Sequence, residues 1–245
     1  MRVLSSAILG LAILGLWLAW DEIPAWRWDG TAIVPIEELA AVPSDNLCPA
    51  PGQTIEFRGD SLAAGGRMGT SQEFEALPYG RIVERELGDQ FPVIIRARGG
   101  FTAAMGEEAW GNIKTPSSLV MIAFGTNDAA PRGWMRERQP VPLSDFEASL
   151  TAHVERAQNQ GSKVALLAPP PGGSIAINQR LHPYRQAVAR VAQSSGIAVL
   201  DPAAALAQCS NISPPLTFDA LHLNVEGHRC MGRWLAEAIC PSEPN

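Results

Sequence analysis

Short apolar segments alternate with longer amphipathic stretches along most of the chain. The apolar segments lie at 54–57, 93–97, 119–124, 164–168 and 197–200, and each is only four to six residues long. In the stretches between them, apolar residues recur every three or four positions, which is the period of an α-helix. Short apolar runs separated by helix-length segments are typical of βαβ units with a buried parallel sheet. We therefore predict a doubly wound α/β sandwich, whose ligands bind beyond the carboxyl ends of the strands.

Polar residues mark the ends of two of these helices. Ser144 and Glu147 have the spacing of a capping box, so we predict that Ser144 caps the helix that ends at Gly161. Asn224 directly precedes the last amphipathic stretch and is its predicted N-cap.

The first 20 residues differ from the rest of the chain. Residues 3–20 carry no charge, and this run would be about 27 Å long as a helix, enough to cross the hydrocarbon core of a bilayer. Four tryptophans lie near the C-terminal end of this run, as aromatic side chains do at membrane interfaces. They are Trp17, Trp20, Trp26 and Trp28. We predict that residues 1–20 form a signal anchor, and a cleaved signal peptide or a buried helix of a soluble protein remain alternatives. With Arg2 kept inside, an anchor or a signal peptide exports the rest of the chain to the periplasmic or extracellular face.

Two further regions follow the apolar segment. Residues 21–53 are rich in proline, with a brief helical pattern at 36–41, and are predicted to form a linker or a segment that wraps around the body. Residues 54–245 are predicted to form one globular domain, because a chain of this length and hydrophobicity can bury a single core.

The four cysteines fit an exported protein. They are Cys48, Cys209, Cys230 and Cys240, and an even number is compatible with two disulfides in an oxidising compartment. Four cysteines allow three pairings, and the sequence does not choose among them. Free buried thiols are the alternative.

The charge of the chain argues against one class of partner. Nineteen basic and 25 acidic residues give a net charge of -6, without any segment dense in lysine and arginine. We therefore expect no binding to the backbone of a nucleic acid.

Residues suited to acyl transfer follow several of the predicted strands. Ser61 comes just after the first strand, and a serine hydroxyl becomes a nucleophile when a base takes its proton. Among the four histidines, His222 has a carboxylate, Asp219, three residues before it at the start of a predicted helix. Asp219 could orient the imidazole of His222 so that its other nitrogen faces Ser61.

Acyl transfer also requires hydrogen-bond donors for the oxyanion that forms on the substrate. The backbone N–H groups of Ser61 and Gly100 and the side-chain amide of Asn127 are candidates from three different strand ends. Glycine suits such a position because it allows close approach and positive φ angles.

Four blocks of sequence, taken in order, resemble those of the SGNH/GDSL hydrolase superfamily. They are Gly59-Asp60-Ser61-Leu62, Gly100 with Thr102, Gly125-Thr126-Asn127-Asp128 and Asp219-x-x-His222. The resemblance covers about residues 54–240. It implies a flavodoxin-like three-layer sandwich with a five-stranded parallel sheet in the order 2-1-3-4-5. It also implies that Ser61 is the nucleophile, His222 the base and Asp219 its partner, with Ser61, Gly100 and Asn127 forming the oxyanion hole.

The expected function is therefore an exported serine esterase that forms an acyl-enzyme, without a metal or an organic cofactor. A short acyl group, such as acetyl on a carbohydrate, is the favoured substrate. A polysaccharide O-acyltransferase and a lysophospholipase or lipase are the alternatives, and a carbohydrate-binding module without catalysis is the least favoured. The oligomeric state does not follow from the sequence.

Other polar residues carry weaker expectations. Asp60, Arg132 and Trp134 are candidate substrate contacts, and Trp134 could stack on a sugar ring, although its loop could also be a solvated basic segment. Of the other histidines, His153 and His182 are expected at the surface or at its boundary. His228 is expected to pack within the last helix.

Overall fold

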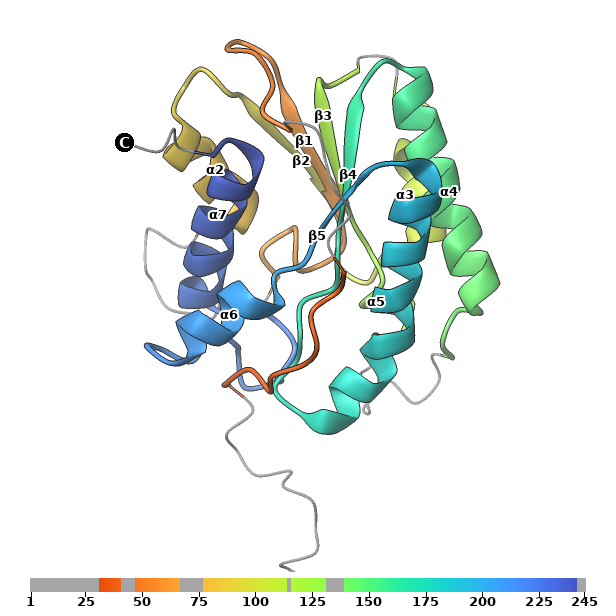
Figure 1. Cartoon of the computed structure of the whole chain (residues 1–245). Coiled ribbons are helices and arrows are strands. Elements are labelled where there is room, and N and C mark those ends of the chain that lie inside the picture. The colour runs from red at the N-terminus through yellow and green to blue at the C-terminus, as the bar shows by residue number, and fades with distance from the viewer. Residues whose placement is uncertain (1–30, 41–46, 67–76, 114–115, 131–138, 242–245) are drawn as a thin grey trace, which may run out of the picture.

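The computed structural model describes residues 31–40, 47–66, 77–113, 116–130 and 139–241 of the 245-residue chain. In this part of the chain, six helices surround a parallel sheet of five strands (Figure 1). The strands are β1 (Ile55–Gly59), β2 (Val93–Ala97), β3 (Leu119–Ala123), β4 (Lys163–Leu167) and β5 (Ala198–Leu200). The helices are α2 (Tyr79–Leu87), α3 (Ala103–Trp110), α4 (Leu143–Asn159), α5 (Ile175–Ser195), α6 (Ala203–Ser210) and α7 (Val225–Ile239).

The sheet has the order β2-β1-β3-β4-β5, which confirms the predicted topology. Each predicted strand is present, with ends within two residues of the prediction. Because all neighbouring strands are parallel, their carboxyl ends lie along one edge, at the bottom of Figure 1. The predicted N-terminal apolar helix lies outside the described residues.

Helices cover both faces of the sheet and create two cores. Figure 1 shows α2, α6 and α7 on one side and α3, α4 and α5 on the other. Alternate residues of the central strand β3 supply both cores: Met121 packs with residues of α2 and α7, whereas Ile122 packs with residues of α4 and α5. The three-layer α/β sandwich is therefore as predicted.

Strand β1 buries two charged residues that its apolar pattern did not indicate. Glu56 and Arg58 are at most 1% exposed, and Arg58 Nε donates to Glu56 Oε1 at 2.6 Å. The hydroxyl of Ser117 donates to the other carboxylate oxygen of Glu56 at 2.8 Å. Arg58 and Ser117 thus occupy both carboxylate oxygens of Glu56, whereas one terminal nitrogen of Arg58 is buried without a partner among the described residues.

The ends of two helices test the capping predictions. Asn224 is the N-cap of α7, where its side chain accepts the Gly227 N–H at 2.9 Å, as predicted. The prediction of a capping box for α4 is wrong, because that helix begins at Leu143, with Pro142 as N-cap and no side-chain cap. Ser144 therefore lies inside the first turn, and Glu147 instead forms an ion pair with Arg190 of α5.

The described part of the proline-rich region packs against the body. Residues 31–40, red in Figure 1, are extended and irregular, so the helical pattern at 36–41 does not produce a helix in this stretch. The Leu216 N–H donates to Thr31 O at 2.9 Å, and the Leu39 N–H donates to Asp201 Oδ2 at 2.8 Å. Residues 31–40 thus lie against the loops that follow α6 and β5.

Two disulfides join distant parts of the body. Cys48 pairs with Cys240 across 192 residues, and Cys209 pairs with Cys230 across 21 residues. The first attaches the chain before β1 to the end of α7, and the second joins α6 to α7. The structure thus selects one of the three pairings that the sequence allowed.

None of the helices in the described ranges has both the length and the apolar character needed to span a membrane. The predicted anchor at residues 3–20 lies outside those ranges.

Candidate active site

Ser61 lies in a tight turn at the carboxyl end of β1. The turn is held by backbone hydrogen bonds from Ala64 N–H to Asp60 O at 3.1 Å and from Gly66 N–H to Ser61 O at 2.7 Å. A Cβ on Gly59 would lie only 2.8 Å from the Cβ of Ala63, so the strand can turn this sharply only without a side chain there. The sequence thus places the Ser61 hydroxyl at the strand edge, where the parallel fold locates its ligands.

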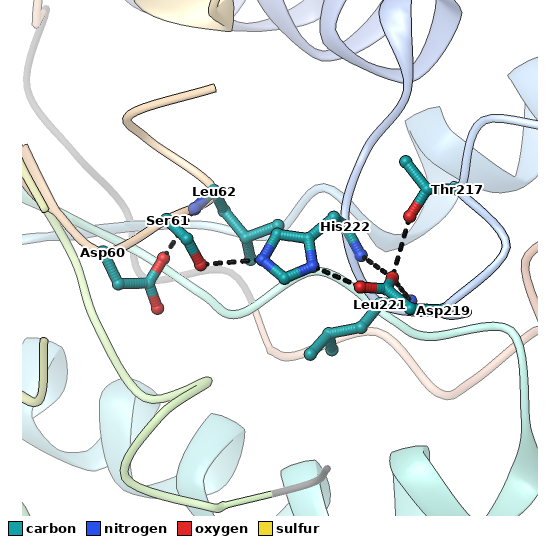
Figure 2. Close-up of polar contacts among 7 residues, drawn as sticks. All are labelled: Asp60, Ser61, Leu62, Thr217, Asp219, Leu221 and His222. Carbon is teal, nitrogen blue, oxygen red and sulfur yellow. Dashed lines mark hydrogen bonds and ion pairs between the residues drawn. The ribbon is translucent and has the colours of Figure 1, made fainter. Parts of the chain in front are cut away.

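Ser61, His222 and Asp219 form a continuous hydrogen-bonded series (Figure 2). Ser61 Oγ lies 2.9 Å from His222 Nε2, and His222 Nδ1 lies 2.7 Å from Asp219 Oδ2. Assigning the ring proton to Nδ1 lets His222 donate to the carboxylate and accept from the serine hydroxyl. The three residues that the sequence predicted to act together are therefore adjacent.

The Asp219 carboxylate is held as an acceptor. Its Oδ1 accepts the Thr217 hydroxyl at 2.8 Å and the backbone N–H groups of Leu221 at 3.1 Å and His222 at 2.9 Å (Figure 2). Burial acts to raise the pKa of Asp219, but the hydrogen bonds of His222, the charge of its imidazole and the Thr217 hydroxyl outweigh it. Together they hold the pKa well below its usual range, so Asp219 is ionised and can orient His222.

The loop between Asp219 and His222 contains a conformation that sequence patterns did not single out. Ala220 has a φ of 58°, in the left-handed region that few residues other than glycine adopt. Its carbonyl accepts the Gly173 N–H at 2.8 Å, and a Cβ on the neighbouring Gly172 would lie 3.0 Å from that carbonyl. Strained residues of this kind often occur at functional sites, where the surrounding structure holds them.

Two of the predicted oxyanion donors come from the ends of β2 and β3. Gly100 has a φ of 83°, and a Cβ on its neighbour Gly99 would lie 3.8 Å from the Cβ of Ser61, so this turn runs beside the serine. Asn127 is 5% exposed, and its Nδ2 donates to Phe101 O at 3.0 Å and to Asp60 Oδ2 at 3.2 Å. The amide of Asn127 thus donates to acceptors on two different loops.

Asp128 ties the β2 and β3 ends together. Its carboxylate is 1% exposed and accepts the Ala103 N–H, at 3.1 and 3.3 Å from its two oxygens. Ala103 is the first residue of α3, so Asp128 satisfies a helix N–H that has no partner within the helix. This bond fixes the loop that carries Gly100 relative to the loop that carries Asn127.

Asp60 is buried beneath the serine. It was predicted as a candidate substrate contact, yet it is only 1% exposed. Its Oδ1 accepts the Leu62 N–H at 2.9 Å, and its Oδ2 accepts the amide of Asn127. In this arrangement Asp60 connects the turn of Ser61 to Asn127. The other two predicted substrate contacts, Arg132 and Trp134, lie outside the described residues.

The remaining histidines have structural positions. His228 packs within α7 as predicted, fully buried, and its Nδ1 accepts the Tyr79 N–H at 3.3 Å. The prediction for His153 is wrong, because it is also fully buried, where its ring stacks on Phe124 and its Nε2 lies 3.1 Å from Ala103 O. Burial lowers the pKa of His153 to about 4 and that of His228 to about 3, so both are neutral near pH 7. His182 is exposed, as predicted.

Over the ranges that the structure describes, no group of three or more histidine, cysteine, aspartate or glutamate side chains could hold a metal ion.

The arrangement of a hydroxyl, an imidazole and a carboxylate at the strand edge of an α/β sandwich is the one that serine hydrolases use. A sequence model of the GDSL-like Lipase/Acylhydrolase family matches residues 57–230, well over half of the chain. The chain therefore belongs to this family and is a carboxylic ester hydrolase. No curated protein matches it by sequence.

Several solved structures share the fold at low sequence identity. A lipase/acylhydrolase from Enterococcus faecalis is 22% identical, with a TM-score of 0.59, over 76% of this chain and 95% of that chain. An α/β hydrolase from the metagenome of Lake Arreo, Spain, is 22% identical, with a TM-score of 0.66, over 81% of this chain and all of that chain. A catalytic mutant of an acetylxylan esterase from Geobacillus stearothermophilus is 20% identical, with a TM-score of 0.63, over 78% of this chain and 96% of that chain.

Proposed function

We propose that the protein is an exported serine esterase that removes short acyl groups from carbohydrate through an acyl-enzyme on Ser61. The observation that carries this proposal is the 2.9 Å contact between Ser61 Oγ and His222 Nε2. On the other side of the imidazole, His222 Nδ1 lies 2.7 Å from Asp219 Oδ2. Nucleophile and base are within hydrogen-bonding distance, and the base is oriented by a third group.

In the first half of the reaction, His222 Nε2 takes the hydroxyl proton while Ser61 Oγ attacks the carbonyl carbon of the ester. The tetrahedral intermediate collapses as the bond to the alcohol oxygen breaks, and His222 returns the proton to that oxygen. In the second half, His222 takes a proton from water, the hydroxide attacks the acyl-enzyme, and the acid leaves as Ser61 regains its proton. Asp219 remains ionised and stabilises the imidazolium in both halves.

The backbone N–H groups of Ser61 and Gly100 and the amide of Asn127 are the proposed donors to the oxyanion. Of the bonds that Asn127 Nδ2 donates to Phe101 O and Asp60 Oδ2, the one to Asp60 is the longer, at 3.2 Å. We expect this N–H to turn from Asp60 to the oxyanion as negative charge develops there. Such a bond, stronger in the transition state than before it, accelerates the chemical step.

The choice of a short acyl group on a carbohydrate rests on the family and on proteins of the same fold. Family membership supports ester hydrolysis, and two proteins of the same fold are acetylxylan esterases by name. One observation favours a second candidate, a lysophospholipase or lipase activity. Phe218, next to Asp219, is 86% exposed and could contact the hydrocarbon of a lipid substrate.

Export is supported by the sequence and by the disulfides. Residues 3–20 are uncharged and long enough to cross a bilayer, and paired cysteines persist mainly in oxidising compartments. We propose that the 1–20 segment anchors the protein and that the body lies on the periplasmic or extracellular side. A variant lacking residues 1–20 should be released from membranes and keep its activity on small soluble esters.

Ser61→Ala tests the mechanism directly. The variant should lose hydrolysis of p-nitrophenyl acetate and of acetylated xylo-oligosaccharides while its thermal unfolding stays close to that of the wild type. Ser149→Ala is the matched control, because this exposed hydroxyl donates to Asp145 O on α4 and should leave turnover unchanged. Undiminished hydrolysis by Ser61→Ala would remove the serine from the mechanism. A graded series of acyl chain lengths, with lysophospholipids included, then decides between the two substrate classes.

A further inference from the structure

A small cavity borders the turn that carries Ser61. It has a volume of about 10 Å³, which is room for about one water molecule. Its wall contains both neighbours of Ser61 in the sequence, Asp60 and Leu62, but not Ser61 itself. The other lining residues are Tyr79, Ala123, Phe124, Thr126, Leu167, Ala168, Pro169, Pro170 and Met231. The cavity therefore borders the serine turn without including Ser61.

Three of the residues that line this cavity carry polar side chains. Tyr79 is 1% exposed, and its hydroxyl has no hydrogen-bond partner among the described residues. Asp60 and Thr126 are 1% and 3% exposed. A buried hydroxyl without a partner costs free energy, and a water molecule in a polar cavity with two to four partners removes that cost.

The pKa of the Tyr79 hydroxyl is affected by its burial and by the charge of Asp60. Burial raises the pKa of Tyr79, and the negative charge of Asp60 raises it further, so the phenol keeps its proton and can donate it. The Asp60 carboxylate accepts the N–H groups of Leu62 and Asn127, and a carboxylate offers about four acceptor sites in all. A carboxylate can therefore accept from several donors at once.

We propose that one water molecule occupies this cavity, accepts the hydroxyl proton of Tyr79 in a hydrogen bond and donates to the Asp60 carboxylate, with the Thr126 hydroxyl as its third partner. Tyr79 is then a positioning residue, because it fixes Asp60 through the water. Asp60 in turn fixes the turn of Ser61 and the amide of Asn127. The water site itself does not depend on the proposed function, whereas the positioning role rests on Asn127 acting as an oxyanion donor.

The position of the Tyr79 ring is set by contacts other than its hydroxyl. The ring packs edge-on against Phe57 at 5.6 Å and stacks with His228 at 5.9 Å between centroids. Its backbone N–H is bound by His228 Nδ1. Removing only the hydroxyl with Tyr79→Phe should therefore keep the ring in place and delete one partner of the water.

The chain supplies a matched control. It contains only two tyrosines, and the second, Tyr184, is also buried, but its hydroxyl donates to Val141 O on the opposite side of the sheet. Tyr184→Phe removes a buried tyrosine hydroxyl without touching the cavity.

The experiment combines kinetics on p-nitrophenyl acetate with high-resolution crystal structures of the full-chain wild type and of the variants. We expect a water within hydrogen-bonding distance of Tyr79 and Asp60 in the wild type. Tyr79→Phe should lower kcat about tenfold with KM unchanged, the effect of losing one hydrogen bond that acts on the transition state. Tyr184→Phe should leave kcat unchanged. Thr126→Val, which removes another partner of the water, should lower kcat in the same direction.

Two results would overturn the proposal. A cavity without ordered density in the wild type would remove the water, and wild-type kcat in Tyr79→Phe would remove the positioning role. If the Tyr79→Phe variant were to unfold, the electron density of the wild type would still test the water site, and the kcat of Thr126→Val would still test the positioning role. These outcomes are separable from failure of the proposed function, because full activity of Ser61→Ala would disprove the nucleophile while leaving the water in its cavity.

Discussion

Asn127 Nδ2 donates a hydrogen bond of 3.2 Å to Oδ2 of Asp60, the residue that directly precedes Ser61. This bond connects the carboxyl ends of β1 and β3, which are neighbours in the sheet. A proposed oxyanion donor is thus held by the turn that carries the proposed nucleophile. The bond to Asp60 keeps the amide next to the nucleophile, so only a small turn of one N–H is needed as negative charge develops on the substrate.

Replacing Asn127 by alanine should therefore act on catalysis more than on binding. We expect kcat on p-nitrophenyl acetate to fall by about 10² to 10³, with little change in KM, because the lost bond stabilises mainly the transition state. Asn127→Asp, which keeps the shape but replaces the donor with an acceptor, should fall at least as far. A change confined to KM would make Asn127 a substrate contact instead.

Asp219 should be required for turnover but not for folding. Asp219→Asn removes the charge that orients His222, and loss of this orientation in a serine hydrolase lowers kcat by about 10⁴. Steady-state kinetics measures the loss, and circular dichroism at neutral pH verifies that the fold is retained. More than a tenth of wild-type kcat would contradict the role given to Asp219.

The two disulfides should differ in their contribution to stability. In the chain-entropy description, closing a longer loop restricts the unfolded chain more, so the bond across 192 residues should contribute about 5 kcal/mol and the bond across 21 residues about 3 kcal/mol. The measurement is denaturant unfolding of two double variants, Cys48→Ser with Cys240→Ser and Cys209→Ser with Cys230→Ser. A larger loss for the second variant would show that local packing, and not loop length, dominates.

The sequence was sufficient to predict the order of the strands in the sheet and the proximity of Ser61, His222 and Asp219. Strands buried on both faces leave a strong apolar pattern, and parallel strands bring their carboxyl ends to one edge, so the proximity of Ser61 and His222 could be inferred. The alternation could not reveal that Glu56 and Arg58 of β1 form an ion pair inside the core. That pairing depends on atoms in three dimensions, as does the selection of one disulfide pairing out of three.

Other features escaped prediction for local reasons. Ser144 and Glu147 match a capping box, yet the helix gains two residues by beginning at Leu143, and the spacing of the two side chains does not indicate this earlier start. His153 lies beside the apolar face of its helix and was expected at the surface or its boundary, but ring stacking and one carbonyl contact let it be buried as a neutral residue. The positive φ of Ala220 could not be predicted either, because alanine rarely adopts this conformation.

The two buried histidines should make stability depend on pH. The folded-state pKa values of His153 and His228, about 4 and about 3, lie below the value of about 6.5 for histidine in an unfolded chain. Between these pKa values the unfolded chain binds more protons than the folded protein. The free energy of unfolding therefore has its full value above about pH 6.5 and falls as the pH decreases from there to about 3. Shifts of this size correspond to several kcal/mol, at roughly 1.4 kcal/mol for each pKa unit.

Urea unfolding at a series of pH values from 7.5 to about 4 separates this effect from that of Asp219, whose lowered pKa adds its own loss of stability only below about pH 4. His153→Gln should lower stability at pH 7.5 and flatten the decline between pH 6.5 and 4, because glutamine does not titrate. His182→Gln is the matched control, because an exposed histidine is solvated in both states and should leave the slope unchanged. An equal slope in wild type and His153→Gln would mean that the buried ring gains its proton without unfolding the protein.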